Sequence, residues 1–173
     1  MSRELRYGLW GGLALWIWMT LGYVVGWHRG PANLYAALAS ALLLSLFIYL
    51  AIRHKRDHDQ GGCIRFREAF LAGMMVSFVS GLMVGVYLMV YSSYINPGEV
   101  EAVVAETRRW YEARQLPAER VEEAVKGVRA SYTKFGRLTY GIGNAMLLGA
   151  VVSLICAALM RRTEAESDPN APS

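Results

Sequence analysis

Long apolar runs alternate with charged connections along this chain. Four of the runs contain no Asp, Glu, Lys or Arg: residues 7–27, 34–52, 69–95 and 138–160. Each run is about as long as the roughly 20 residues that a helix needs to cross a bilayer. The pattern therefore predicts an all-α fold, an integral membrane four-helix bundle, in a single membrane domain over residues 1–162. The last residues, 163–173, are polar and rich in proline, and we expect them to be disordered.

The longest connection, 97–135, shows helical periodicity of its own. We expect Asn96 to cap a first helix that begins at Pro97, and Pro117 to begin a second helix that ends at Gly136. Apolar residues recur at helical spacing in both: Val100, Val103, Val104 and Tyr111 with Trp110 beside them, then Val121, Val125, Val128, Tyr132 and Phe135. The segment is thus predicted to be an amphipathic helical hairpin. Its apolar faces either cover each other, lie on the outer leaflet or meet a partner protein.

Small residues recur at every fourth position in the last two spans. They are Gly73, Ser77, Gly81 and Gly85 in the third span, and Gly141, Ala145, Gly149 and Ser153 in the fourth. Lipid tails give no hydrophobic drive for helix association, so close backbone contact between small residues has to supply it. We expect these two spans to pack tightly and antiparallel. The first span has weaker pairs of the same kind, and such pairs serve either internal packing or a homo-oligomer.

The composition agrees with a membrane protein, since 54% of the 173 residues are hydrophobic. The net charge of +4 does not indicate nucleic-acid binding, because the basic residues gather at the ends of the spans. Lys and Arg tie in number between the two sides of the predicted threading. Those of the amino terminus, the 53–68 loop and the carboxyl-terminal end lie closer to the spans, so we place both termini in the cytoplasm and the hairpin outside it.

The inner loop, 53–68, is a first place to look for chemistry. Its basic residues suit contact with anionic lipid headgroups, although positive-inside topology alone also explains them: Arg53, Lys55, Arg56, Arg65 and Arg67. His54, His58 and Cys63 are metal-ligand types. Their spacing matches no metal-binding motif, so we predict no metal and no cofactor.

The spans hold no ionisable Asp, Glu, Lys, Arg or His, which disfavours a proton- or ion-coupled transporter. Asn144 is the most polar residue within them. It serves either as a hydrogen-bonding contact between helices or, with Tyr87 and Tyr91, as part of a candidate pocket at the outward end of the bundle.

Motifs for a nucleophile, a phosphate loop or a dinucleotide site are absent from the sequence. We therefore predict a multi-pass membrane protein that is not an enzyme. The first interpretation is a noncatalytic interaction or structural module, with lipid, a protein partner bound through the hairpin, or a second copy as its partners. The alternative is a lipid- or small-molecule-binding protein or a transporter subunit. A membrane enzyme built on His54 and His58 comes third.

The order of several short motifs resembles a known family. The motifs are Arg56-Asp57, Gly61-Gly62, Ile64, Phe66, Ala69-Phe70 and Gly73 before the third span, Tyr94 and Pro97 after it, and Gly149, Ser153-Leu154-Ile155, Ala157 and Arg161-Arg162 at the close. This arrangement resembles the bacterial membrane family called domain of unknown function 4199. The resemblance implies a four-helix protein of the bacterial inner membrane, and it brings no activity, cofactor or catalytic residue.

Overall fold

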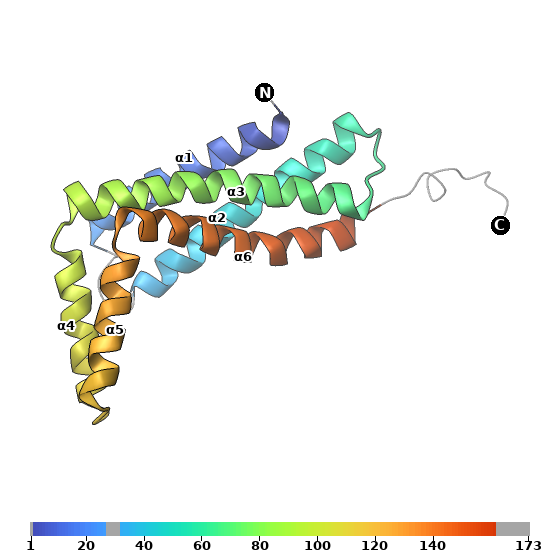
Figure 1. The fold of residues 1–173 in the computed structure, drawn as a ribbon. Helices are drawn as coiled ribbons and strands as arrows, with labels where there is room; N and C mark the ends of the chain where they lie inside the picture. The colour runs from blue at the N-terminus through green and yellow to red at the C-terminus, as the bar shows by residue number, and fades with distance from the viewer. Residues whose placement is uncertain (1, 27–31, 162–173) are drawn as a thin grey trace. The chain divides into compact units, whose positions relative to one another are not determined.

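The computed structural model describes residues 2–26 and 32–161, and the regular elements in these ranges are helical (Figure 1). The predicted tail at 163–173 and the end of the first predicted span at residue 27 lie outside the described residues. The elements, with π-helical turns named η, are α1 (Arg3–Val25), α2 (Ala32–His54), η1 (Lys55–Asp59), α3 (Phe66–Val90), η2 (Tyr91–Ile95), α4 (Glu99–Glu112), α5 (Ala118–Ser131) and α6 (Lys134–Met160).

Four of these helical segments are long and apolar enough to cross a membrane: α1, α2 with η1, α3 with η2, and α6. The all-α class is confirmed, and the four apolar helices indicate a membrane protein. The helices run further into polar sequence than the apolar runs do. For example, α1 begins at Arg3 because the Ser2 hydroxyl accepts a hydrogen bond from the Leu5 amide at 3.3 Å, which caps the helix ahead of its apolar residues.

The chain forms two compact units. We call residues 1–83 with 142–173 the bundle unit, and residues 84–141 the hairpin unit. Helices α3 and α6 each contribute to both. The expectation of a single membrane domain over 1–162 stays a prediction.

Helix α3 is the most enclosed of the four apolar helices. Half of its most apolar window is buried, against 22–28% for the other three. On one side it packs against α1, where the Ser80 hydroxyl donates to the Gly8 carbonyl at 2.9 Å and the Trp16 indole donates to the Met83 carbonyl at 2.8 Å. A side chain at Gly8 would come within 2.6 Å of Val79 Cβ, so glycine lets the two helices approach.

On its other side α3 crosses α6. A Cβ atom at Gly73 would overlap Ser153, and one at Gly149 would overlap Ser77. The earlier residue of α3 thus meets the later residue of α6, so the two helices run antiparallel at this crossing. Ile48 of α2 lies within van der Waals range of both glycine positions.

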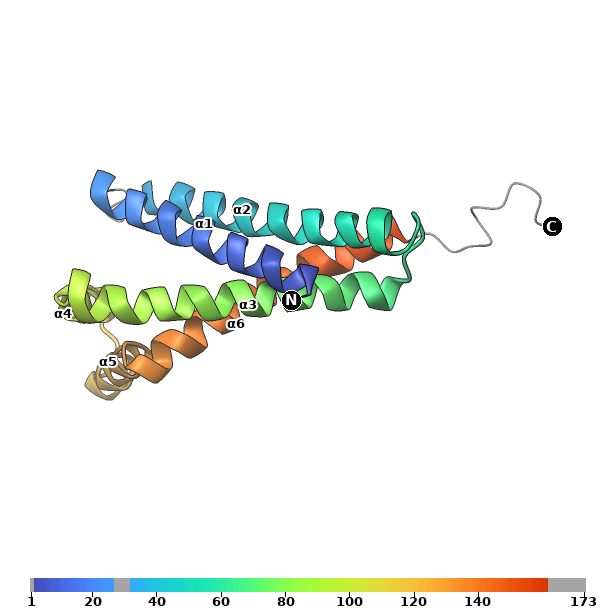
Figure 2. The same ribbon diagram turned by 90° about the horizontal axis from the view of Figure 1, so that it is seen from above.

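The start of α1 and the end of α2 are joined by polar contacts at one end of the bundle unit, which we call the inner end. Lys55 forms an ion pair with Glu4 at 2.6 Å, and Arg3 forms one with Asp59 at 2.5 Å. The chain then turns toward α3 through Gly62, whose φ of +93° is one that residues with a side chain rarely adopt. Figure 2 shows α1 and α2 side by side along their length.

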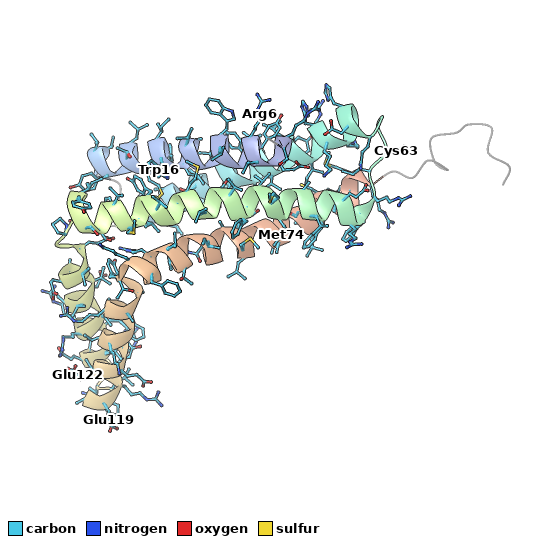
Figure 3. The ribbon with its side chains drawn as sticks, turned by 45° about the horizontal axis from the view of Figure 1, so that its top comes forward. Arg6, Trp16, Cys63, Met74, Glu119 and Glu122 are labelled. Atoms are coloured by element: carbon cyan, nitrogen blue, oxygen red, sulfur yellow. The ribbon has the colours of Figure 1, made fainter. Side chains whose placement is uncertain are left out.

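Helices α4 and α5 of the hairpin unit lie side by side and antiparallel, as expected (Figure 1). Val104, Val121 and Val125 are the buried apolar residues between them. The far end of the hairpin carries Glu119 and Glu122 (Figure 3). The apolar stripes of the two helices therefore cover each other to a large extent.

The ends of the hairpin differ from the prediction. Helix α4 begins at Glu99, and its cap position is Gly98, which has no side chain to cap the helix. The Asn96 amide donates to the Tyr91 hydroxyl at 3.2 Å. Helix α5 ends at Ser131 rather than Gly136. There the Thr133 hydroxyl accepts a hydrogen bond from the Gly136 amide at 3.0 Å and so opens α6, which leaves Phe135 in α6 and 78% exposed.

Candidate functional site

Charged side chains hold the two helices of the hairpin together from outside. Arg129 of α5 binds Glu101 of α4 through two hydrogen bonds, of 2.8 and 3.1 Å. Arg108 of α4 forms an ion pair with Glu122 of α5 at 2.8 Å. The hydrogen bond from Arg129 lowers the pKa of the Glu101 carboxyl below its ordinary value of 4.5, and Coulombic attraction adds to this. The two-pronged geometry fixes the register of α4 against α5.

A third pair fixes the base of the hairpin. Arg137, in the first turn of α6, donates to Glu99 in the first turn of α4 at 2.7 Å, and its guanidinium lies 3.6 Å from the centre of the Tyr132 ring. The Arg137 side chain is only 9% exposed. Burial, followed by the charge of Glu99, raises the pKa of the Tyr132 hydroxyl.

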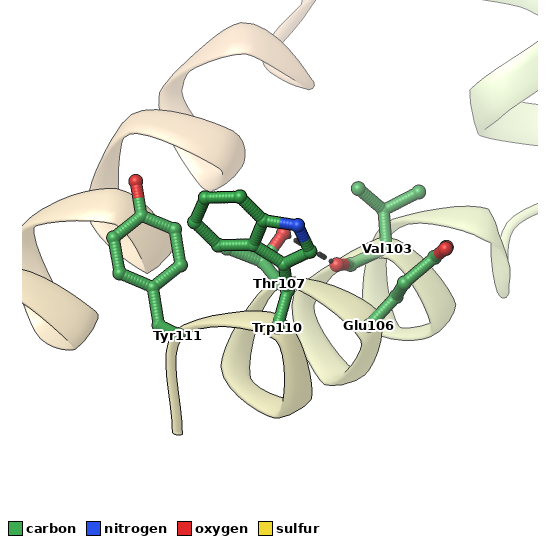
Figure 4. Close-up of a pocket in the computed structure, with 5 residues that line it drawn as sticks. All are labelled: Val103, Glu106, Thr107, Trp110 and Tyr111. Atoms are coloured by element: carbon green, nitrogen blue, oxygen red, sulfur yellow. Dashed lines mark hydrogen bonds between the residues drawn. The ribbon is translucent and has the colours of Figure 1, made fainter. Parts of the chain in front are cut away.

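An open groove lies along α4. Its volume is about 360 Å³. Five residues line it: Val103, Glu106, Thr107, Trp110 and Tyr111. We call it the α4 groove. Figure 4 shows the Trp110 indole beside the Tyr111 ring, and the Thr107 hydroxyl bonded to the Val103 carbonyl, at 2.8 Å. Thr107 is thereby satisfied within the helix, and it adds little polarity to the groove.

Trp110 is held in place although half of it is exposed. The Arg114 guanidinium lies 3.5 Å from the centre of its ring and donates to its carbonyl at 3.2 Å. The Tyr111 ring lies 5.0 Å away at a tilt of 55°. Within the described chain Glu106 forms no ion pair, so its carboxylate is open to a cation. Aromatic surface beside one free carboxylate suits an apolar side chain that is followed by a basic one.

The predicted packing residues lie on both sides of the unit boundary. In the bundle unit Gly73 lies against Ser153, and Gly149 against Ser77. In the hairpin unit a Cβ at Gly85 would come within 2.7 Å of the Leu138 carbonyl oxygen. Gly141 and Ala145 are buried on α6, and Gly81 is buried on α3.

The five basic residues of the inner loop fall into two groups. Arg53 and Arg56 form ion pairs with Asp57, at 3.4 and 2.7 Å, and Lys55 pairs with Glu4. Arg65 and Arg67 are exposed and form no ion pair within residues 2–26 and 32–161. Phe66 between them is 41% exposed. Residues 65–67 therefore present two exposed cations that form no ion pair within the described residues, with an aromatic ring between them.

The candidate pocket residues occupy different units. Tyr87 and Tyr91 belong to the hairpin unit, where their rings stack at 6.0 Å and are largely buried. Asn144 belongs to the bundle unit, and its side chain is exposed. The grouping of these three residues around a ligand stays a prediction.

The candidate metal ligands make other contacts. The His54 and His58 rings stack at 4.3 Å, and His54 also lies 2.9 Å from Arg3 and 3.4 Å from the Tyr7 hydroxyl. In the part of the chain that the structure describes, no three His, Cys, Asp or Glu side chains come together as metal ligands would.

The comparison with protein families decides the assignment. A family model described as "Protein of unknown function (DUF4199)" matches residues 6–162. The chain belongs to this family. The DUF4199 match extends from α1 to the end of α6, so the hairpin is part of the matched region. No curated protein and no solved structure matches the chain. DUF4199 membership thus supports the resemblance and leaves the activity to be inferred from the geometry.

Sequence reasoning about this DUF4199 protein missed two features. Glu106 and Thr107 were not singled out, although Trp110 and Tyr111 are adjacent and cannot both lie on one buried helical stripe. Arg137 was not singled out either, yet it is buried against Glu99 and Tyr132. Two features of the sequence indicate such a contact. Arg137 directly precedes the apolar run that begins at Leu138, and acidic residues lie at the start of α4.

Proposed function

We propose that this chain is a noncatalytic membrane module whose α4 groove holds a segment of a second protein. The proposal rests on the open α4 groove, because the two helices of the hairpin already bury their shared apolar face without it. Val104, Val121 and Val125 bury the shared apolar face of α4 and α5, so Trp110 is not needed to hold the hairpin together. An aromatic residue that stays half exposed but is ordered by Arg114 is typical of an interaction surface.

The occupant that fits best is a protein segment with an apolar side chain next to a lysine or arginine. The apolar side chain would pack on Trp110 and Tyr111, and the cation would pair with Glu106. A lipid headgroup fits less well, because the groove offers an acid where an anionic headgroup needs a base.

A photoreactive amino acid at Val103, which lines the groove, tests this proposal in native membranes. We expect crosslinks to one dominant protein, and we expect Trp110→Ala or Glu106→Gln to reduce them several-fold. The matched control is the same photoreactive residue at Val125, which is buried between the helices and should crosslink only within the hairpin. Crosslinks at Val103 that are only to lipid or only within the chain, or that ignore both substitutions, would contradict the proposal.

A second candidate function is binding of anionic lipid at the inner end, and residues 65–67 favour it. Arg65 and Arg67 are exposed without ion pairs to the described residues, and Phe66 can insert at headgroup depth. Each basic residue near an anionic surface contributes about 1 kcal/mol. Replacing both arginines with glutamine should weaken phosphatidylglycerol retention in native mass spectrometry by an order of magnitude or more. Arg53→Gln, which removes a cation that is already paired with Asp57, is the control and should change retention little.

The proposed location is the bacterial inner membrane, with both termini in the cytoplasm. At the inner end of the bundle unit basic residues outnumber acidic ones: Arg3, Arg6, Arg53, Lys55, Arg56, Arg65, Arg67 and Arg161, against Glu4, Asp57, Asp59 and Glu68. Positive charge near span ends favours the cytoplasmic side. Three spans precede the hairpin, which would place it outside the cytoplasm. Reporter tags at the two termini should both be cytoplasmic, and tags found on opposite sides would exclude this threading.

A further inference from the structure

Asn144 is a polar side chain exposed at membrane depth. It lies six residues into the apolar run that begins at Leu138, or about 9 Å along the helix axis at 1.5 Å per residue. Its side chain is exposed, and no hydrogen bond of its amide is found within residues 2–26 and 32–161. A primary amide left without partners in hydrocarbon costs several kcal/mol.

Five hydroxyls of the apolar helices form hydrogen bonds within the chain, whereas the Ser153 hydroxyl is buried without a partner among the described residues. The Thr20, Ser40 and Ser45 hydroxyls each donate to the carbonyl four residues earlier on their own helix. Ser77 does the same, and Ser80 donates to α1. A hydroxyl has one proton to place, whereas the amide of Asn144 has two donors and an acceptor. The unpaired donors and acceptor of the Asn144 amide therefore point to a hydrogen-bonding partner outside the described chain.

The surroundings of Asn144 on α6 form a regular seam. Exposed residues recur at alternating steps of three and four, in the heptad order a, d, a, d, a: Asn144, Leu147, Val151, Leu154 and Ala158. We call this set the α6 seam. Leu147 is 73% exposed and Val151 is 56% exposed, so nothing in the described bundle unit covers its centre. The spacing is that of a left-handed coiled coil, in which a polar residue at one a position fixes register and the number of strands.

The small-residue face of α6 is already occupied. Ala145, Gly149, Ser153 and Ala157 are buried, and Gly149 and Ser153 lie against α3. An association between copies through that face would have to displace α3. The α6 seam therefore is the face of this helix that remains for contact with another helix.

We propose that a second copy of this chain packs against the α6 seam and that the two Asn144 amides bind each other across a twofold axis. Two copies inserted in the same direction present parallel α6 helices. In a symmetric parallel pair each a residue meets its own counterpart, so Asn144 must face Asn144. A primary amide complements itself, because each copy can donate one N–H to the carbonyl oxygen of the other. This self-complementarity favours a second copy over an apolar lipid chain. The inference does not depend on the α4 groove.

Disulfide crosslinking of the full-length chain in native membranes tests the pairing. With Cys63 and Cys156 replaced by serine, Val151→Cys at an a position and Leu147→Cys at a d position should each form a dimer under mild oxidation. Leu42→Cys, which is 72% exposed on α2, is the matched control and should stay largely monomeric. Equal crosslinking at position 42 would mean random collision and would overturn the proposal.

The role of Asn144 itself is tested by its substitution. Hydrogen bonds between membrane helices correspond to an approximately 3- to 30-fold change in association. Asn144→Leu should weaken dimerisation by about this factor in a fluorescence energy transfer titration in bicelles, whereas Asn144→Gln, which keeps the amide, should weaken it less. A monomer at all protein-to-lipid ratios, or a dimer unaffected by Asn144→Leu, would contradict the assignment.

Discussion

Helices of this protein approach most closely at glycines, where a single added methyl group would overlap a neighbouring helix. At Gly149 there is no room for a methyl group, because the Ser77 side chain already occupies its place. At Gly143, less than two turns earlier on the same helix, a methyl group would meet no atom within 4 Å apart from the adjoining backbone of its own helix. Two glycines in one helix thus have opposite tolerance for the same substitution.

We therefore expect Gly149→Ala to destabilise the protein and Gly143→Ala to leave it unchanged or slightly more stable. Overpacking costs about 1–3 kcal/mol, and the higher helix propensity of alanine offsets about 1 kcal/mol of this. Unfolding by sodium dodecyl sulfate in mixed micelles, followed by circular dichroism, measures the difference. Equal stability of the two variants would show that the α3–α6 contact is looser than described.

The sequence pattern predicted some of these residue-level features. A period of four in small residues is visible without coordinates because it depends on helix geometry alone. The spacing named Gly73 and Gly149, but it did not pair them with Ser153 and Ser77. Asn144 was expected either to contact another helix or to line a pocket with Tyr87 and Tyr91. An apolar run offers no marker of which side faces lipid, so the exposure of Asn144 became visible only in the structure.

At the scale of elements, the hairpin is held together by a small apolar contact and by ion pairs. The prediction of two amphipathic helices held because valine periodicity and Pro117 are strong local signals. The helix ends were predicted less well. Asn96 prefers a contact with the Tyr91 hydroxyl, and Thr133 starts α6 before the apolar run begins. The first contact needs a side chain of η2 and the second is a local cap at the start of α6, and apolar periodicity encodes neither.

The Glu101–Arg129 pair makes the hairpin sensitive to acid. Because the pKa of Glu101 is lowered in the folded chain, the pair's contribution is present above the ordinary value of 4.5 and is lost as the pH falls through the lower folded pKa. Glu101→Gln should reduce hydrogen-exchange protection of residues 99–131 by about two- to five-fold at pH 7, in keeping with an exposed pair. The difference between the wild type and the variant should shrink as the pH is lowered stepwise below 4.5.

The control for this comparison is Glu112→Gln, which removes an exposed carboxylate that forms no ion pair with the described residues. It should cause no loss of protection at any pH of this series. A difference between Glu101→Gln and wild type that stays unchanged over the whole acid titration would mean that the charge pair is not its origin.

At the scale of the whole molecule, the four apolar helices were the most predictable feature. Their length and lack of charge follow from the thickness of a bilayer, so composition alone reveals them. The distribution of ion pairs at the inner end was not predictable in the same way. Lys55 and Arg53 lie near each other in the sequence, yet Lys55 pairs with Glu4 at the start of α1, and that contact exists only once α1 and α2 have come together.

The enclosed position of α3 has a consequence for how the chain is made. Helix α6 is synthesised after α3, so until α6 emerges the glycine and serine face of α3 has no α6 to lie against. A nascent chain stopped after the hairpin would expose Gly73 and Ser77 to lipid. We therefore expect a chain truncated after the hairpin to be degraded faster than the full-length chain, which a pulse-chase experiment in cells would measure.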